Sequence, residues 1–160
     1  MNNGKIAPDL QSLVKTIASL KRQGRTIVFT NGCFDLFHYG HLASLQRAKQ
    51  LGDILVVGIN NDASVKKIKG PNRPLIPCRE RTAIVAALTC VDYCIPFSGK
   101  TPARIIAALK PDILAKGAEY RNKPIVGEVD VKRRGGRIVL LPMVKNISTS
   151  VIAKRIKRIS

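Results

Sequence analysis

The chain has 160 residues, 45% of them hydrophobic, which is typical of one folded domain and excludes an intrinsically disordered chain. Aromatic residues make up 4% and tryptophan is absent, so the expected core consists of Ile, Val, Leu and Ala. The formal net charge of +18 favours anionic partners, and both nucleic acid and phosphorylated metabolites meet that condition.

The sequence also bears on the compartment. Residues 1–11 hold no continuous apolar run, so we expect no secretory signal, and no apolar stretch approaches membrane-spanning length. The four cysteines form no C-x-x-C pair, and free thiols that act as small apolar side chains are typical of a reducing compartment. We therefore expect a cytoplasmic protein without a membrane partner.

The chain opens with a predicted helix. Apolar residues recur at helical spacing from Leu10 to Leu20, and Gly24 ends that helix. We treat residues 1–24 as an N-terminal helical extension that packs on the sheet of a single domain covering residues 1–160.

Strands and helices then alternate to the C-terminus. Asp62 is a candidate N-cap for a short lysine-rich helix, and Thr101 is a candidate N-cap for a helix with Pro102 at its first position. The predicted strands cover residues 26–30, 54–60, 91–97, 112–115 and 137–141. Further helices are predicted over about residues 40–51, 79–88, 126–134 and 150–159, with a proline-rich loop at 70–77.

This alternation predicts an α/β fold, a doubly wound five-stranded parallel sheet with helices on both faces. In such sheets ligands bind at the carboxyl ends of the strands, where the strand order reverses, and the first strand is usually central. The loop after Thr30 is therefore the first place to look for chemistry.

That loop combines three features that suit an anion. Gly32 allows the backbone to approach a ligand closely. His38 and His41 are three positions apart, so at a helix start both rings can face the same side. The helix that begins near Gly40 directs its free N–H groups to the same place. Zinc is a rival ligand, but no third metal ligand has suitable spacing, so we predict a phosphate site and no resident metal.

These residues resemble a known signature. The segment H-Y-G-H, preceded by G-C-F-D, is similar to the H-x-G-H motif of the cytidylyltransferase-like nucleotidyltransferase superfamily, whose fold is Rossmann-like. The resemblance implies direct attack of an acceptor phosphate on the α-phosphorus of a nucleoside triphosphate. His38 and His41 would hold triphosphate oxygens and stabilise charge in the transition state, and Mg²⁺ would accompany the triphosphate.

Three later segments also follow predicted strands or precede helices. Basic groups at Lys69, Arg73 and Arg81 could hold the acceptor phosphate or the triphosphate, although a solvated surface is the commoner place for a single Lys or Arg. Glu119 follows Lys116 and Gly117, and could accept hydrogen bonds from ribose hydroxyls, help hold a metal, or be an ordinary loop carboxylate. The hydroxyls of residues 148–150 could cap the last helix, bind a phosphate, or both.

Together these segments resemble a narrower family. The pattern D-A-S-V-K-x-x-K-G-P-x-R-P, then K-G-x-x-Y and the closing S-T segment, is similar to the adenylyltransferase domain of bacterial ADP-heptose synthesis, from about residue 25 to 156. The resemblance implies transfer of AMP from ATP to D-glycero-β-D-manno-heptose 1-phosphate, for lipopolysaccharide or other surface glycans.

The same resemblance implies a set of site residues. Catalytic roles fall on His38, His41 and Lys69, and phosphate contacts on Arg73 and Arg81. The remaining ATP contacts fall on Gly32, Cys33, Phe34, Asp35, Lys116, Gly117, Glu119, Ser148, Thr149 and Ser150.

Two departures from the family pattern matter. The family has G-G-D-Y where this chain has Gly117-Ala118-Glu119-Tyr120, which makes base or sugar specificity less certain than reaction type. Some relatives carry an attached sugar-kinase domain, and at 160 residues we expect none here, so a separate kinase would supply the sugar 1-phosphate.

Alternatives stay open at this point. The same chemistry fits a cytidylyltransferase for glycerol 3-phosphate or a flavin-forming adenylyltransferase. A basic nucleic-acid-binding module fits the charge of +18, but no recognised binding motif and few aromatic residues support it. Relatives commonly form dimers, so a homodimer is compatible with the resemblance, while the residues themselves leave the oligomeric state open.

Overall fold

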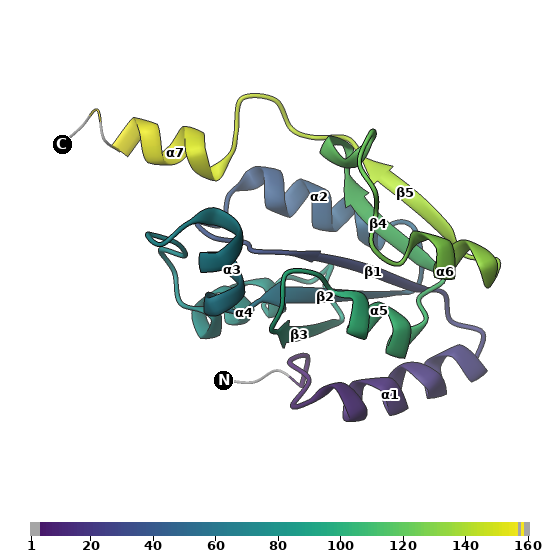
Figure 1. Ribbon diagram of the computed structural model, residues 1–160. Coiled ribbons are helices and arrows are strands. Elements are labelled where there is room, and N and C mark those ends of the chain that lie inside the picture. The colour runs from purple at the N-terminus through teal and green to yellow at the C-terminus, as the bar shows by residue number, and fades with distance from the viewer. Residues whose placement is uncertain (1–3, 157, 159–160) are drawn as a thin grey trace.

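The computed structural model describes residues 4–156 and 158. Its centre is an all-parallel sheet of five strands in the order β3-β2-β1-β4-β5 (Figure 1). The chain starts the sheet in the middle with β1, builds outward to β3 and then returns to the other side with β4 and β5. The strand bounds are β1 Ile27–Gly32, β2 Ile54–Asn60, β3 Tyr93–Phe97, β4 Ile113–Gly117 and β5 Arg137–Leu141.

Helices cover both faces of the sheet, which confirms the predicted doubly wound fold. One apolar layer joins α2 and α4 to the sheet through residues such as Leu45 and Val85, and the opposite layer joins α1, α5 and α6 through Leu13, Ile106 and Val131. The helix bounds are α1 Leu10–Arg22, α2 Tyr39–Lys49, α3 Asp62–Lys69, α4 Cys78–Ala86, α5 Ala103–Leu109, η1 Ala118–Tyr120, α6 Glu128–Arg133 and α7 Thr149–Ile156.

The alternation of side chains along β1 explains why the sheet is buried on both faces. Ile27 and Phe29 belong to the layer under α1 and α5, whereas Val28 belongs to the layer under α2 and α4, and all three are fully buried. A strand with both faces covered reads as a continuous apolar run, which is why this segment was recognisable from sequence.

Some boundaries differ from prediction for identifiable reasons. β1 continues to Gly32 instead of residue 30, because Asn31 and Gly32 still pair with Gly58 and Ile59 of β2. The expected helix over 150–159 starts at Thr149 and is described to Ile156, and residues 157, 159 and 160 lie outside the described part of the chain.

Two predicted N-caps are wrong by one position. The cap of α3 is Asn61, whose side chain accepts a hydrogen bond from the Ser64 N–H at 2.9 Å, and this leaves the Asp62 carboxylate free for another partner. The cap of α5 is Pro102, not Thr101, and it makes no side-chain capping bond. Propensity places a cap near a helix start but does not fix the exact residue.

The N-terminal segment does more than supply a helix. Ile6 forms a parallel bridge with Cys94, and Ala7 N–H donates to the Cys94 carbonyl at 2.9 Å while Cys94 N–H donates to Lys5 at 2.8 Å. Residues 5–7 therefore lie along the outer edge of β3. All four cysteines are free, as expected. Within residues 4–156 and 158, no helix has the length and apolarity needed to cross a membrane.

Candidate active site

A cavity of about 480 Å³ opens at the carboxyl ends of β1, β2 and β4, and we refer to it as the strand-end cavity. Predicted site residues from the first motif line it: Gly32, Cys33, Phe34, His38 and His41. Later predicted residues that line it are Lys69, Lys116, Gly117, Glu119 and residues 148–150. Three predicted residues, Asp35, Arg73 and Arg81, are not among its lining.

The two histidines form a stacked pair at the start of α2. His38 is the N-cap residue, with extended backbone, and His41 lies one turn later on the same side. Their ring centroids are 3.8 Å apart with an interplanar angle of 16°. Phe34 meets the His41 ring edge-on at 5.3 Å, so the inner imidazole has an aromatic support. The predicted common orientation of the two rings is thus what the structure shows.

Burial favours the uncharged form of both imidazoles. It lowers the pKa of His41 to about 4, and the neighbouring His38 and Lys69 act in the same direction. The pKa of His38 is also lowered, first by burial and then by the charge of Lys69. Nδ1 of each ring is buried and, in the described part of the chain, lacks a hydrogen-bond partner. In its neutral form each ring has one N–H group, which it can donate to an anion.

The glycine between the histidines lets the first turn of α2 lie close to the His38 ring. A Cβ added at Gly40 would lie 3.0 Å from that ring and 3.3 Å from Ile147. A side chain at this position would therefore have to displace His38 or Ile147 slightly. Phe34 and Leu36, by contrast, hold φ near +50° without being glycine, so the loop between β1 and α2 adopts an uncommon backbone on the way to the pair.

Asp35 is fully buried and faces away from the cavity. It accepts hydrogen bonds from the N–H groups of Leu75 at 2.9 Å and Ile76 at 3.0 Å, and it forms an ion pair with Arg73 at 2.8 Å. Burial alone would raise the pKa of Asp35, but these bonds outweigh it and hold the pKa below its usual value. The prediction that the Asp35 carboxylate contacts ATP does not fit this placement, because both oxygens already anchor the loop after α3.

Arg81 is the clearest correction to the predicted site. Its side chain is 0% exposed, so it cannot face a substrate phosphate. Nε donates to the Ile76 carbonyl at 2.8 Å, and Nη1 donates to the carbonyls of Cys33 and Asn60, the latter at 2.8 Å. Nη2 pairs with Asp62 at 2.8 Å. One guanidinium thus joins the ends of β1 and β2, the start of α3 and the loop after it.

This buried arginine sets the position of α3, and α3 carries the predicted catalytic lysine. Lys69 is the last residue of α3; it is exposed and lines the strand-end cavity. Its charge lowers the pKa of His38, His41 and Cys33, and all four residues line the same cavity. Arg73, on the other hand, forms an ion pair with Asp35.

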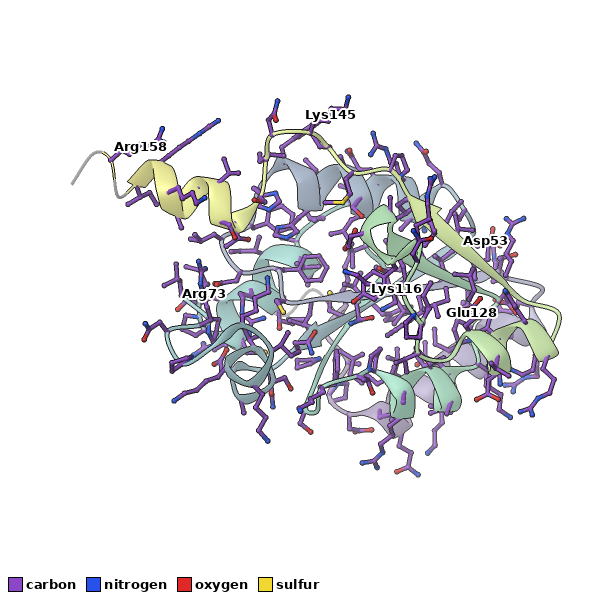
Figure 2. All side chains as sticks on the ribbon, turned by 45° about the horizontal axis from the view of Figure 1, so that its top comes forward. Asp53, Arg73, Lys116, Glu128, Lys145 and Arg158 are labelled. Carbon is purple, nitrogen blue, oxygen red and sulfur yellow. The ribbon has the colours of Figure 1, made fainter. Side chains whose placement is uncertain are left out.

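Lys116 enters the cavity from the carboxyl end of β4. Its Nζ donates to Asn31 Oδ1 and lies 5.4 Å from the centre of the Tyr120 ring. Burial lowers the pKa of Lys116 to about 8, against the opposing effect of the Glu119 carboxylate. Figure 2 shows Lys116 in the interior of the molecule, whereas Lys145 and Arg158 extend outward into solvent.

The segments after β4 and before α7 close the cavity. A Cβ at Gly117 would lie 2.0 Å from the Glu119 carboxylate, which folds back over this glycine. Ser148 Oγ accepts a hydrogen bond from Val151 N–H at 3.2 Å, as an N-cap does, and Thr149 Oγ1 donates to the Asp35 carbonyl at 2.9 Å. Residues 148–150 therefore both cap α7 and line the cavity.

Sequence reasoning missed several cavity residues. Asn60 ends β2, Lys100 follows β3, and Tyr120 and Met143 follow β4 and β5. The signal that could have found them is position alone, since the carboxyl ends of parallel strands meet at one edge of the sheet. Among the described residues, no cluster of three or more His, Cys, Asp or Glu side chains is placed to hold a metal ion.

A doubly wound parallel sheet with two histidines after its central strand defines a Rossmann-like nucleotidyltransferase domain. The comparisons agree: the family model described as cytidylyltransferase-like matches residues 29–155, and the chain belongs to this family. The family resemblance deduced from the H-x-G-H segment is thereby confirmed.

Curated relatives are bifunctional proteins of greater length. The bifunctional protein HldE of Syntrophotalea carbinolica is 49% identical over 146 residues, which are 91% of this chain and 30% of that protein. HldE of Helicobacter pylori strain Shi470 is 48% identical over 151 residues, which are 94% of this chain and 32% of that protein. The chain thus spans about a third of the length of these relatives.

Two solved structures share the fold. A lipopolysaccharide core biosynthesis protein from Thermoplasma volcanium GSS1 superposes with a TM-score of 0.62 at 27% identity, covering 76% of this chain and 98% of that one. The pantoate-beta-alanine ligase of Francisella tularensis gives 0.59 at 17% identity over 95% of this chain and 76% of that one, and this similarity concerns the fold alone.

Proposed function

We propose that this chain transfers AMP from ATP to D-glycero-β-D-manno-heptose 1-phosphate and releases pyrophosphate. The observation that carries the proposal is the stacked pair His38 and His41 at the start of α2, in one cavity with Lys69. Similarity to the HldE proteins and to a lipopolysaccharide core biosynthesis protein supports this substrate class.

The reaction is a direct displacement. An oxygen of the acceptor phosphate forms a bond to the α-phosphorus, and the bond from the α-phosphorus to the oxygen bridging to the β-phosphate breaks. Pyrophosphate leaves with the electron pair of that bond, and no covalent enzyme intermediate is needed. The protein contributes position and charge stabilisation, because the histidine N–H groups, the first turn of α2 and Lys69 surround the developing charge.

The nucleoside would lie on the side of β4 and β5. Lys116 and Glu119 line that side, and Glu119 is the carboxylate available there to accept hydrogen bonds from ribose hydroxyls. Residues 148–150 would bind phosphate oxygens at the start of α7. Mg²⁺ would arrive bound to the triphosphate, where it neutralises phosphate charge. The free thiols fit a cytoplasmic setting.

The test is a matrix of donors and acceptors. ATP and CTP are each combined with heptose 1-phosphate, glycerol 3-phosphate and flavin mononucleotide, and pyrophosphate is followed over time. We expect the highest kcat/KM with ATP and heptose 1-phosphate, and the variant carrying both His38→Ala and His41→Ala serves as the inactive control. A preference for CTP with glycerol 3-phosphate, or for the flavin, would replace the proposed substrates. Pyrophosphate release that the double variant retains would remove the histidines from the mechanism.

A further inference from the structure

Lys100 is a cavity residue to which the function above assigns no role. It lies in the loop between β3 and α5, is exposed and lines the strand-end cavity. β3 ends at Phe97, which is in register with Asn60 of β2, and Asn61 N–H donates to the Phe97 carbonyl at 2.9 Å. The loop therefore starts directly beside the end of β2.

A glycine reverses the direction of this loop. Gly99 has φ +106°, a conformation that a residue with a side chain rarely adopts. Lys100 follows immediately and is on the cavity side, whereas its neighbours Ser98 and Thr101 line a separate hollow next to the N-terminal segment. The lysine is thus brought to the strand ends by backbone geometry.

The two sides of the cavity differ in charge. On the side built by β2, α3 and the β3–α5 loop, the lining residues are Asn60, Ile68, Lys69 and Lys100, which include two cations and no carboxylate. Glu119, the carboxylate in the cavity lining, belongs to the opposite side, after β4. In the part of the chain that the structure describes, neither lysine has an ion-pair partner. Two unpaired ammonium groups on one side of a cavity favour the binding of an anion there.

The two arginines nearby cannot supply that charge. Arg81 is fully buried with four hydrogen bonds, and the Arg73 guanidinium is held by Asp35. The lysines are therefore the cations available to an acceptor that enters on this side.

We propose that Lys100, on the same side of the cavity as Lys69, binds the phosphate of the acceptor and thereby selects acceptors that carry a phosphate dianion. This inference rests on the proposed function and names a specificity residue for it. The physical need is clear: the acceptor phosphate has to approach a triphosphate of the same sign, and cations beside it offset that repulsion. Lys69 lines the same cavity as the histidines and would serve both phosphates, whereas Lys100 serves the acceptor.

The experiment separates the two substrates. Lys100→Ala, Lys100→Gln and Lys100→Arg are compared with the unmodified protein for KM of heptose 1-phosphate, KM of ATP and kcat. Lys15→Ala is the control, since it removes the same charge from an exposed position on α1. We expect the Ala and Gln variants to raise the acceptor KM about tenfold or more, as for a lost charged contact, with the ATP KM changed less than about twofold on the same scale. Arginine should restore most of the affinity, and Lys15→Ala should change nothing.

Calorimetric titration keeps this inference separable from the proposed function. Heptose 1-phosphate is titrated into the unmodified protein and into Lys100→Ala, each with a non-hydrolysable ATP analogue. Weaker binding by the variant, even without pyrophosphate release by the unmodified protein, would support the role of Lys100 and reject the proposed reaction. Equal acceptor KM and equal binding in both proteins would overturn the role of Lys100 and leave the proposed reaction unaffected. An increase confined to the ATP KM would have the same meaning.

Discussion

The histidine side and the lysine side of the cavity hold their functional groups in opposite ways. His38 and His41 come from one helical turn, stack on each other and are constrained by Gly40 beneath them. Lys69 and Lys100 come from separate elements and are exposed. The position of the lysine side depends on the buried Arg81, which joins the strand ends to α3. A local motif is therefore enough for one side, while the other depends on long-range contacts that can be broken from a distance.

The largest expected effect is loss of stability when the buried contact behind the lysine side is removed. Arg81→Met leaves the carbonyls of Cys33, Asn60 and Ile76 without their donor, so we expect the free energy of unfolding to fall by about 3–5 kcal/mol. Urea unfolding measures it. Arg79→Met, at an exposed position on the same helix, is the control and should stay within about 0.5 kcal/mol. Equal stability of the two variants would mean that Arg81 does not hold the strand ends together.

On the histidine side we expect a kinetic effect instead. His41→Ala should lower kcat roughly 100- to 1,000-fold, as expected when one preorganised donor to a transition-state charge is lost. Pyrophosphate release measures kcat, and circular dichroism checks that the fold is kept. A folded variant with normal turnover would contradict the assigned role of His41.

Acid should affect the histidine side before the lysine side. The pKa of His41 is about 4 in the folded protein, against 6.5 as the ordinary value that the unfolded chain retains. Between these values the unfolded chain binds more protons, so stability is complete above pH 6.5 and falls as the pH drops toward 4. We expect His41 to account for a loss of about 3 kcal/mol by pH 4. Urea unfolding at several pH values should show this loss shrinking in His41→Gln; an unchanged slope would argue against a buried neutral ring.

The smallest expected effect concerns the hydrogen bond that joins the start of α7 to the loop after β1. Thr149→Val removes the hydrogen bond from Oγ1 to the Asp35 carbonyl while keeping the shape, and should cost about 1 kcal/mol of stability. We also expect a several-fold rise in the KM of ATP, because the start of α7 lines the cavity. Thr149→Ser keeps the hydroxyl and should behave like the unmodified protein. If Val and Ser variants were alike, the hydroxyl would have no positioning role.

The sequence could predict what local pattern determines. The strand before Asn31, the helix after Gly40 and the common orientation of the histidines all follow from spacing within a few residues, and the structure agrees. Arg81 could not be interpreted in this way, because its partners lie 5 to 48 positions away in the chain. In sequence it looks like any basic residue near a phosphate motif, and only its burial distinguishes it from Lys69.

Asp35 and Lys100 show in two ways that the motif does not determine which residues line the cavity. Asp35 lies inside the motif, and this favoured a ligand contact, yet its carboxylate is committed to backbone groups 40 and 41 positions away. Lys100 belongs to no motif, yet the loop after β3 brings it to the cavity. Nearness to a motif in sequence and nearness in space are separate facts where a parallel sheet gathers loops from the whole chain.

The short pairing of residues 5–7 with β3 has a consequence for self-association. It blunts one edge of the sheet, whereas no described strand pairs with the outer edge of β5. Two molecules that met along β5 would form a twofold pair, and the N-terminal segment on β3 would hinder the addition of further strands at the other edge.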